Sequence, residues 1–260
     1  MNKKLISVLA AAVLTVQAAA MPIVANAEAH ATYITNSDFL DCAVGGAVDK
    51  PIYGLNIICD GSPWLTKGSA SRHYQTFMYD EDTEQNYVNM YSNSDKTGTG
   101  DGAGSFYMYQ RDTTSNFSQT FGYCQFDIRM NSGAFELNYG SFSDPTSNTN
   151  YLANTLTFTS TSIKMFDGSS QTNLANINPG KWYTVKIAIN NVLQCSDIAV
   201  YDAQTHKLIG SGDALSYRQD ECTKVCIWCF GYIRGSTYDY DLTNVTISKT
   251  DSDDNPYSAF

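Results

Sequence analysis

The stretch FGYCQFDIRM, residues 121–130, alternates apolar residues with polar or aromatic ones at period two. Successive side chains of a β-strand point to opposite faces, so this alternation predicts a strand with one buried face. KWYTVKIAIN, residues 181–190, repeats the pattern and predicts a second strand of the same kind. Each strand needs another layer to cover its apolar face. The side chains predicted to point inward in the first stretch are Cys124, Phe126, Ile128 and Met130.

Short aromatic and β-branched runs recur along the chain, separated by clusters of Gly, Ser, Asn, Asp and Thr, and almost nothing reads as helix. Many short strands at this spacing predict an all-β sandwich or barrel. An Asn-Ser-Gly turn is predicted between the strands at 121–130 and 134–139. The predicted strands are Thr32–Thr35, Ile52–Ile58, Gln75–Tyr79, Tyr87–Tyr91, Ser105–Arg111, Phe121–Met130, Ala134–Tyr139, Leu156–Thr159, Ser162–Phe166, Trp182–Ile189, Asp197–Asp202, Lys207–Gly210, Lys224–Ile233 and Asp241–Ser248.

The first 27 residues read as a secretory signal peptide, because Lys3 and Lys4 precede an apolar run and residues 25–27 resemble a cleavage site. We therefore expect a secreted, extracellular protein. Residues 28–250 are expected to form one β-sandwich domain, and residues 251–260 a flexible acidic tail. No second apolar run approaches the roughly 18 residues of a membrane-spanning helix, so no membrane association is expected after cleavage.

The chain is acidic, with a formal net charge of −10 at pH 7, and loss of the two lysines with the signal peptide makes it more so. An acidic surface repels phosphate backbones, so nucleic acid is not an expected partner. A neutral polymer or a cation is compatible with this charge.

Seven cysteines lie in the expected mature chain, an odd number that leaves at least one unpaired within the molecule. Export permits disulfides, but the sequence does not choose between the possible pairings. The CIWC segment has CxxC spacing but lies in a strand-like run, so buried thiols or ordinary disulfides are the favoured interpretation. The cysteines are Cys42, Cys59, Cys124, Cys195, Cys222, Cys226 and Cys229.

Several segments, in their order along the chain, resemble the concanavalin A-like lectin/glucanase superfamily with its laminin G-like and family 16 glucanase-like members. FGYCQFDIRMNSG followed by AFELNYG resembles a strand pair of that superfamily, and GKWYTV at 180–185 resembles its G-K-W-Y-x-V strand. DLTNVTI at 241–247 resembles the closing strand. The resemblance covers most of the mature chain. It implies a two-sheet antiparallel jelly-roll β-sandwich whose concave face holds a carbohydrate.

One motif of the superfamily is missing. Its glycoside hydrolases carry an E-x-D-x-x-E strand, because hydrolysis needs two carboxylates, about 5–5.5 Å apart when configuration is retained. The segment 134–139 contains only Glu136. The acidic run 80–84 is better explained as a solvated loop than as an active site. We therefore expect carbohydrate binding without catalysis.

The candidate binding residues combine aromatic rings with planar polar groups on the predicted outward faces of four strands. Aromatic rings suit the apolar C–H faces of sugars, while Arg, Gln, Glu and Asn side chains suit their hydroxyls. The alternation does not tell which sheet is concave. The candidates are Tyr107, Tyr109, Tyr123, Gln125, Arg129, Glu136, Asn138, Trp228 and Tyr232.

Two other functions stay open. An enzyme on the same fold would be a polysaccharide lyase or a glycoside hydrolase, and Tyr123, Gln125 and Arg129 are side-chain types that lyase chemistry uses. A protein-binding adhesion domain is the second alternative.

The resemblance also implies a structural calcium ion near the meeting point of the first and last strands. Asp38 and Asp241 occupy roughly these positions, and carboxylate oxygens are ligands that Ca²⁺ prefers.

Overall fold

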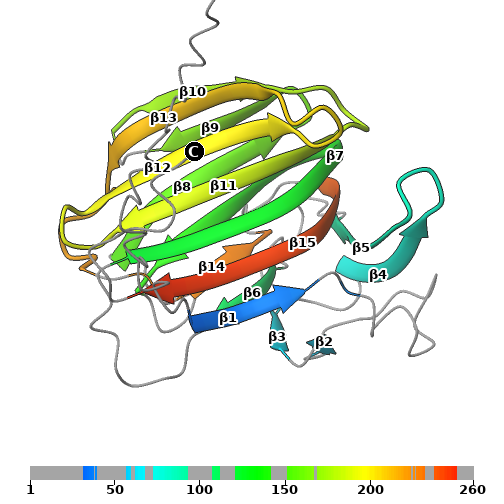
Figure 1. Cartoon of the computed structure of the whole chain (residues 1–260), viewed down its shortest axis with the longest axis horizontal. Coiled ribbons are helices and arrows are strands. Elements are labelled where there is room, and N and C mark those ends of the chain that lie inside the picture. The colour runs from blue at the N-terminus through cyan, green and yellow to red at the C-terminus, as the bar shows by residue number, and fades with distance from the viewer. Residues whose placement is uncertain are drawn as a thin grey trace, which may run out of the picture.

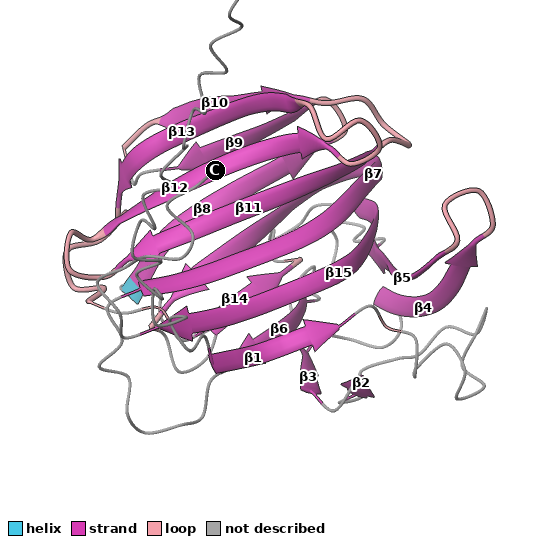
Figure 2. Ribbon diagram, viewed as in Figure 1, coloured by secondary structure: helices cyan, strands magenta, loops and turns pink. Residues whose placement is uncertain are grey.

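The computed structural model describes residues 32–37, 39, 57–59, 62–67, 73–92, 107–111, 121–141, 151–166, 169–223, 225, 227–231 and 237–250. The predicted signal peptide and acidic tail lie outside these residues. The described chain is almost entirely strand joined by turns (Figure 2). It contains no helix with the length and hydropathy to cross a membrane.

The strands alternate in direction and pair antiparallel throughout the described chain. They are β1 Thr32–Ser37, β2 Ile57–Cys59, β3 Ser62–Lys67, β4 His73–Asp80, β5 Gln85–Ser92, β6 Tyr107–Arg111, β7 Phe121–Gly140, β8 Leu152–Thr159, β9 Ser162–Phe166, β10 Gln171–Asn176, β11 Trp182–Asn190, β12 Cys195–Asp202, β13 Leu208–Ser216, β14 Ile227–Phe230 and β15 Tyr238–Thr250.

Two layers of strands make the sandwich (Figure 1). The layer nearer the viewer, here called the front sheet, runs β4-β5-β15-β7-β11-β12-β13, with β1 beside the second part of β15. The layer behind it, the rear sheet, runs β10-β9-β8-β7-β14-β6-β3-β2. Two antiparallel sheets packed face to face confirm the predicted all-β sandwich.

Strand β7 belongs to both sheets, because its 20 residues run from one layer into the other. Its first part pairs with β11 and β15, and its second part with β8 and β14. Along β15 the register pairs Ser132 and Met130 with consecutive residues, so Asn131 is the extra residue of a β-bulge. The predicted Asn-Ser-Gly turn is therefore wrong: the chain continues where a hairpin was expected.

Gly133 explains why turn-like residues occur at this bulge. Its φ is +71°, and a Cβ atom here would lie 2.1 Å from the carbonyl oxygen of Thr237. Only glycine fits such a close backbone approach in the left-handed region. Even-numbered side chains of β7 point inward before the bulge and odd-numbered ones after it, where the strand has passed into the rear sheet.

The core lies between the sheets and is rich in aromatic rings. All four side chains predicted to point inward from the first part of β7 are fully buried. Phe126 meets Phe230 edge to face at 5.2 Å between ring centroids, and Phe135 stacks on Phe158 at 4.7 Å. Burial of each such ring stabilises the fold by about 1.5–3 kcal/mol.

Strand β14 faces the opposite way from the prediction. Trp228 is 3% exposed and stacks on Tyr139 at 4.9 Å inside the core, although it was expected on the surface. The segment VCIWCFG is apolar at both odd and even positions, so its alternation could not decide which face is buried. The larger rings of Trp228 and Phe230 fill the core, and the smaller Cys229 takes the other face.

Within the described part of the chain, Cys124 and Cys195 are free thiols. Cys124 lies fully buried in the core, and burial raises the pKa of its thiol well above the ordinary value. Cys195 is half-buried at the start of β12. The pairing of the other cysteines stays a prediction.

Candidate functional site

The predicted binding residues divide between two opposite faces of the sandwich, because β7 contributes to both sheets. Tyr123, Gln125 and Arg129 lie on the outer face of the front sheet, here called the front face. Glu136 and Asn138 lie on the outer face of the rear sheet, the rear face, as the inward packing of Phe135, Leu137 and Tyr139 requires.

The other predicted residues fall in three places. Tyr107 and Tyr109 lie on β6. This strand pairs with β14, which pairs with the second part of β7, so both tyrosines belong to the rear sheet. Trp228 lies in the core. Tyr232 and Asp38 lie outside the described residues. The sequence therefore grouped residues that the fold separates.

A chain of hydrogen bonds crosses the rear face from β7 to the segment after β13. Asn138 Nδ2 lies 3.4 Å from Glu136 Oε2, and Thr155 Oγ1 donates to Asn138 Oδ1 at 2.7 Å. Arg218 Nη1 donates to Thr155 Oγ1 at 3.1 Å. With Phe166 these residues form what we call the rear-face cluster: Glu136, Asn138, Thr155, Phe166 and Arg218.

The strand register explains how the cluster assembles. Asn138 pairs with Thr155, and Thr155 pairs with Phe166, so the three residues form one row across β7, β8 and β9. Arg218 follows β13, and its backbone N–H donates to the carbonyl of Ala153 at 2.5 Å. Its guanidinium lies 4.7 Å from the centroid of the Phe166 ring, a cation–π contact.

Burial sorts the cluster into supporting and accessible groups. Asn138 and Thr155 are 6% and 2% exposed, so these two side chains hold their neighbours in place. Glu136, Phe166 and Arg218 are half-buried and reach the surface. The sequence analysis missed Phe166 and Arg218, since their contact joins segments 52 positions apart.

Glu136 is the acidic member of the cluster. Burial raises the pKa of its carboxyl, and this effect outweighs the opposing hydrogen bond from Asn138 and the charge of Arg218. Glu136 and Arg218 do not ion-pair with each other within the described chain. Their side chains are linked through Asn138 and Thr155 instead.

A second cation stands in the next row of the rear face. Glu136 pairs with Thr157 on β8, and Thr157 pairs with Lys164 on β9. Adjacent strands are about 4.8 Å apart, so the backbones of Glu136 and Lys164 are separated by roughly 10 Å. Lys164 is half-buried beside inward-facing Ile163 and Met165. These two neighbouring rows of the rear face thus bring Lys164 and Arg218 close to Glu136.

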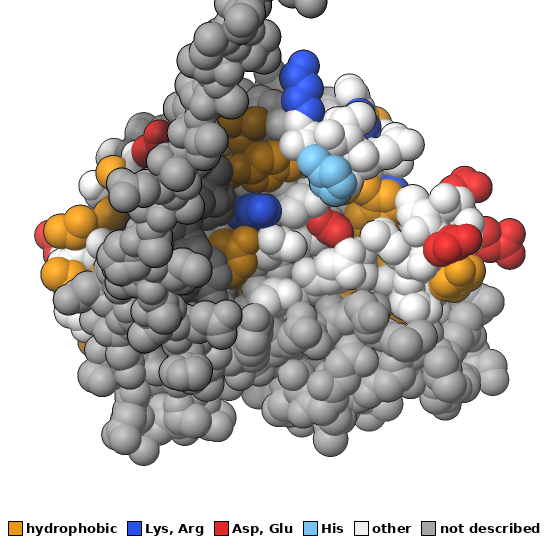
Figure 3. Space-filling model, viewed as in Figure 1, with side chains coloured by type: hydrophobic (Ala, Val, Ile, Leu, Met, Phe, Trp, Pro, Cys, Tyr) orange, Lys and Arg blue, Asp and Glu red, His pale blue; other side chains and the backbone are white. Residues whose placement is uncertain are grey.

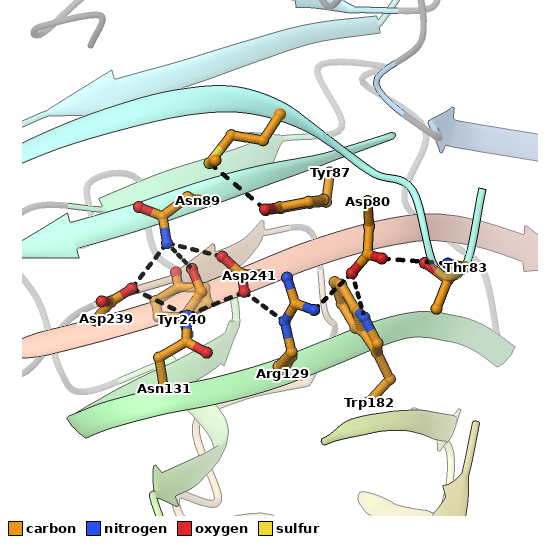
Figure 4. A network of polar contacts seen from close by, with 11 residues as sticks. Asp80, Thr83, Tyr87, Asn89, Arg129, Asn131, Trp182, Asp239, Tyr240 and Asp241 are labelled. Atoms are coloured by element: carbon orange, nitrogen blue, oxygen red, sulfur yellow. Dashed lines mark hydrogen bonds and ion pairs between the residues drawn. The ribbon is translucent and has the colours of Figure 1, made fainter. Parts of the chain in front are cut away.

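On the front face, Arg129 is enclosed by charged and aromatic partners (Figure 4). Its Nη1 lies 2.6 Å from Asp80 Oδ2, and its Nε lies 2.7 Å from Asp241 Oδ2. The guanidinium lies 4.6 Å from the Trp182 ring centroid and 5.1 Å from that of Tyr87. The arginine therefore joins the tip of the β4–β5 hairpin to β7, β11 and β15.

Two amides complete this network. Asn89 Nδ2 donates to Asp239 at 2.8 Å and Asp241 at 2.7 Å, and Asn131 Nδ2 donates to the same two carboxylates at 3.2 and 3.0 Å (Figure 4). Asn131 is the bulged residue of β7, so the bulge places its amide at this site. Because Arg129 is surrounded by these partners, its role is structural. The network is here called the Arg129 clamp, and its members are Asp80, Asn89, Arg129, Asn131, Asp239 and Asp241.

The predicted calcium ligand Asp241 belongs to this clamp. It is 2% exposed, and its oxygens accept hydrogen bonds from Arg129, Asn89 and Asn131. The described part of the chain gathers no group of three His, Cys, Asp or Glu side chains suited to a metal ion. Calcium binding stays a prediction, since Asp38 lies outside that part.

The acidic run 80–84 also contributes to the clamp through one member. Residues 81–84 form an exposed turn, as predicted. Asp80 differs, because it is paired with Arg129. Burial opposes ionisation of Asp80, but hydrogen bonds from Arg129, Thr83 and Trp182 lower its pKa.

The middle of the front face carries a mixed set of side chains (Figure 3). Tyr123 donates its hydroxyl to Gln125 Oε1 at 2.9 Å, and Lys186 Nζ lies 5.1 Å from the Tyr201 ring centroid. Asp127 is 8% exposed and accepts hydrogen bonds from Thr184 and Asn244. Among the described side chains of this face, the carboxylates Asp80, Asp127, Asp239 and Asp241 outnumber the cations Arg129 and Lys186.

No protein-family model matches the chain, and no curated protein matches it by sequence. Among solved structures, a sialidase is similar at 16% identity with a TM-score of 0.52, over 72% of this chain and 17% of the sialidase chain. This chain thus spans about a sixth of that protein.

Two further structures cover most of their own length. A carbohydrate esterase of Shiga toxin-encoding bacteriophage phi24B is 12% identical, with a TM-score of 0.47, over 73% of this chain and 90% of that one. A PL-14 alginate lyase from Aplysia kurodai is 10% identical, with a TM-score of 0.47, over 84% and 97%. Identities this low concern the fold alone, which is the two-sheet antiparallel β-sandwich that the sequence predicted.

Proposed function

We propose that this protein binds a polysaccharide without cleaving it, through the rear-face cluster, after export and removal of residues 1–27. The observation that carries the proposal is the hydrogen-bonded chain from Glu136 through Asn138 and Thr155 to Arg218, beside the Phe166 ring. A sugar presents apolar C–H faces and a rim of hydroxyls. The cluster offers an aromatic ring together with a carboxyl and a guanidinium held in fixed positions.

The rear face is favoured over the front face because its arginine has fewer charged and aromatic partners within the protein. Arg129 already contacts two carboxylates and two rings. Arg218 makes one hydrogen bond through Nη1, and the described residues place no carboxylate in ion-pair contact with it. A guanidinium has five N–H donors, so donors of Arg218 remain for a ligand.

The test is a retention screen of the purified mature protein against soluble and insoluble polysaccharides. Phe166→Ala and Tyr201→Ala form a matched pair, because each removes a half-buried ring beneath a cation, one on each face. The proposal predicts that Phe166→Ala loses retention and Tyr201→Ala keeps it. Loss in Tyr201→Ala alone would place the site on the front face and contradict the proposal.

One observation favours a second function, that of a polysaccharide-degrading enzyme. A carboxyl whose pKa is raised by burial, as in Glu136, is the kind of group that serves as a general acid. The same screen is therefore read for new reducing ends and for unsaturated products absorbing at about 235 nm, a lyase signature that goes with the acid–base chemistry of such sites. Products that disappear in Glu136→Gln would establish the enzyme. If the screen shows no binding and no products, the protein-adhesion alternative is favoured.

A further inference from the structure

We infer that the rear-face site selects an anionic glycan, namely a polyuronate, whose carboxylate pairs with Arg218. The inference rests on the proposed carbohydrate binding and narrows its ligand class. It starts from the sign of the local charge. The whole chain has 26 acidic and 16 basic residues, but the two rows of β7, β8 and β9 that form the cluster carry Lys164 and Glu136 and lie beside Arg218, while Asp220 and Glu221 lie in the exposed turn that follows Arg218.

The side chain of Arg218 is fixed by its neighbours in a position where it can bind a carboxylate. Phe166 supports the flat side of the guanidinium, Thr155 fixes Nη1, and the backbone N–H of Arg218 is anchored on Ala153. Because a planar guanidinium matches a carboxylate through two parallel hydrogen bonds, an arginine fixed in this way recognises carboxylates with little loss of side-chain freedom.

The carboxyl of Glu136 does not form an ion pair with Arg218. Asn138 and Thr155 lie between the two side chains, so each bonds to a neutral group instead of to the other. Lys164 stands one row away, across Thr157. A polymer with a carboxylate on each sugar can reach both cations at once, whereas a neutral polymer leaves both charges unused.

The acidic surface of the protein makes this inference specific. A chain with a net charge of −10 repels polyanions overall, so a polyuronate has to be held by a local cluster of cations. The front face does not offer such a cluster, since the described carboxylates there outnumber Arg129 and Lys186.

The experiment compares polygalacturonate with its fully methyl-esterified form, which keeps the backbone and removes the charge. We expect the mature protein to bind the acid form at least tenfold more tightly, and to lose that preference as salt is raised. Arg218→Gln is expected to weaken binding of the acid form by roughly tenfold or more, the loss of one charge-assisted pair. Arg218→Lys should recover only part of it, because the ammonium lacks the planar fork.

Lys186→Gln is the matched control, because it removes one positive charge from the front face. It should change affinity less than twofold if binding depends on the rear-face cations. Thermal unfolding of each variant confirms that it is folded. Equal affinity for the acid and ester forms would overturn the inference and leave the proposed carbohydrate binding intact. Retention of no glycan at all would overturn both.

Discussion

Arg129 Nη1 and Asp80 Oδ2 lie 2.6 Å apart and fasten the tip of the β4–β5 hairpin to the front sheet. The same guanidinium holds Asp241, which is almost fully buried. Removing the arginine therefore leaves a buried carboxylate without its cation. Arg129 therefore links β4, β7 and β15, three strands that are far apart in the sequence.

Arg129→Ala is expected to destabilise the fold by about 3–5 kcal/mol, the range for removing one partner of a buried ion pair. Lys181→Ala is the control, since it breaks the ion pair with Asp202 at a half-exposed position. Urea unfolding of both variants measures the difference. Equal small shifts in the two midpoints would mean that Arg129 is not a structural clamp.

Asp80→Asn tests the same ion pair through its pH dependence. Because the folded-state pKa of Asp80 is lowered, the carboxylate contributes stability above its ordinary pKa of 3.8 and loses it as the pH falls through the lowered value. At pH 7 the variant should be less stable than the wild type by about 1.5–3 kcal/mol, the range for a hydrogen bond to a charged group. The gap should close in acid, and a gap independent of pH would argue against the ion pair.

Glu136→Gln is expected to show the opposite trend. Its folded-state pKa is raised, so Glu136 contributes stability below its ordinary pKa of 4.5 and loses it as the pH rises through the raised value. The variant should therefore gain stability relative to the wild type between acid and neutral pH, as followed by thermal unfolding. Glu81→Gln, in the exposed hairpin turn, is the comparison. A constant difference across this range contradicts the burial of Glu136.

Gly133→Ala tests the crossing of β7 between the sheets. Positive φ costs about 1–2 kcal/mol for a residue with a Cβ atom, and at Gly133 that atom would also meet the Thr237 carbonyl oxygen at 2.1 Å. Gly180→Ala is a close match, because its φ is +73° and nothing lies within 4 Å of the added atom. We expect Gly133→Ala to lower the free energy of unfolding clearly more than Gly180→Ala. Similar losses would disprove the close approach.

Trp228→Ala separates packing from binding. The side chain fills the core against Tyr139, so truncation should cost about 3–5 kcal/mol. Trp228→Phe keeps a ring in the core and should keep glycan binding at temperatures where the variant is folded. Loss of binding in a folded Trp228→Phe variant would show that this ring contacts the ligand after all.

Period-two alternation predicted the fold because half-buried strands dominate this chain. The pattern placed Cys124, Phe126, Ile128 and Met130 correctly in the core, and Ser162–Phe166 was predicted with the bounds of β9. Strands β3 and β10 were missed, since SPWLTK and QTNLAN lack a clear alternation. Local pattern failed where pairing with a neighbouring strand decides the structure.

The site was less predictable than the fold, because its residues meet only through strand pairing. Strand β7 passes from the front sheet to the rear sheet, so Arg129 and Glu136 point outward on opposite faces of the sandwich. Nothing near Arg218 in the sequence announces that its guanidinium packs on Phe166. Recognising this contact requires the order of β7, β8 and β9 in the rear sheet.

Hydroxyl-radical footprinting of the mature protein, with and without a retained polysaccharide, tests the central claim most directly. It reports which aromatic side chains the ligand covers. Phe166 on the rear face and Tyr201 on the front face are both half-buried, so each can be followed in the same sample. The account predicts that the ligand protects Phe166 and leaves Tyr201 unchanged. Protection of Tyr201 with no change at Phe166 would contradict it.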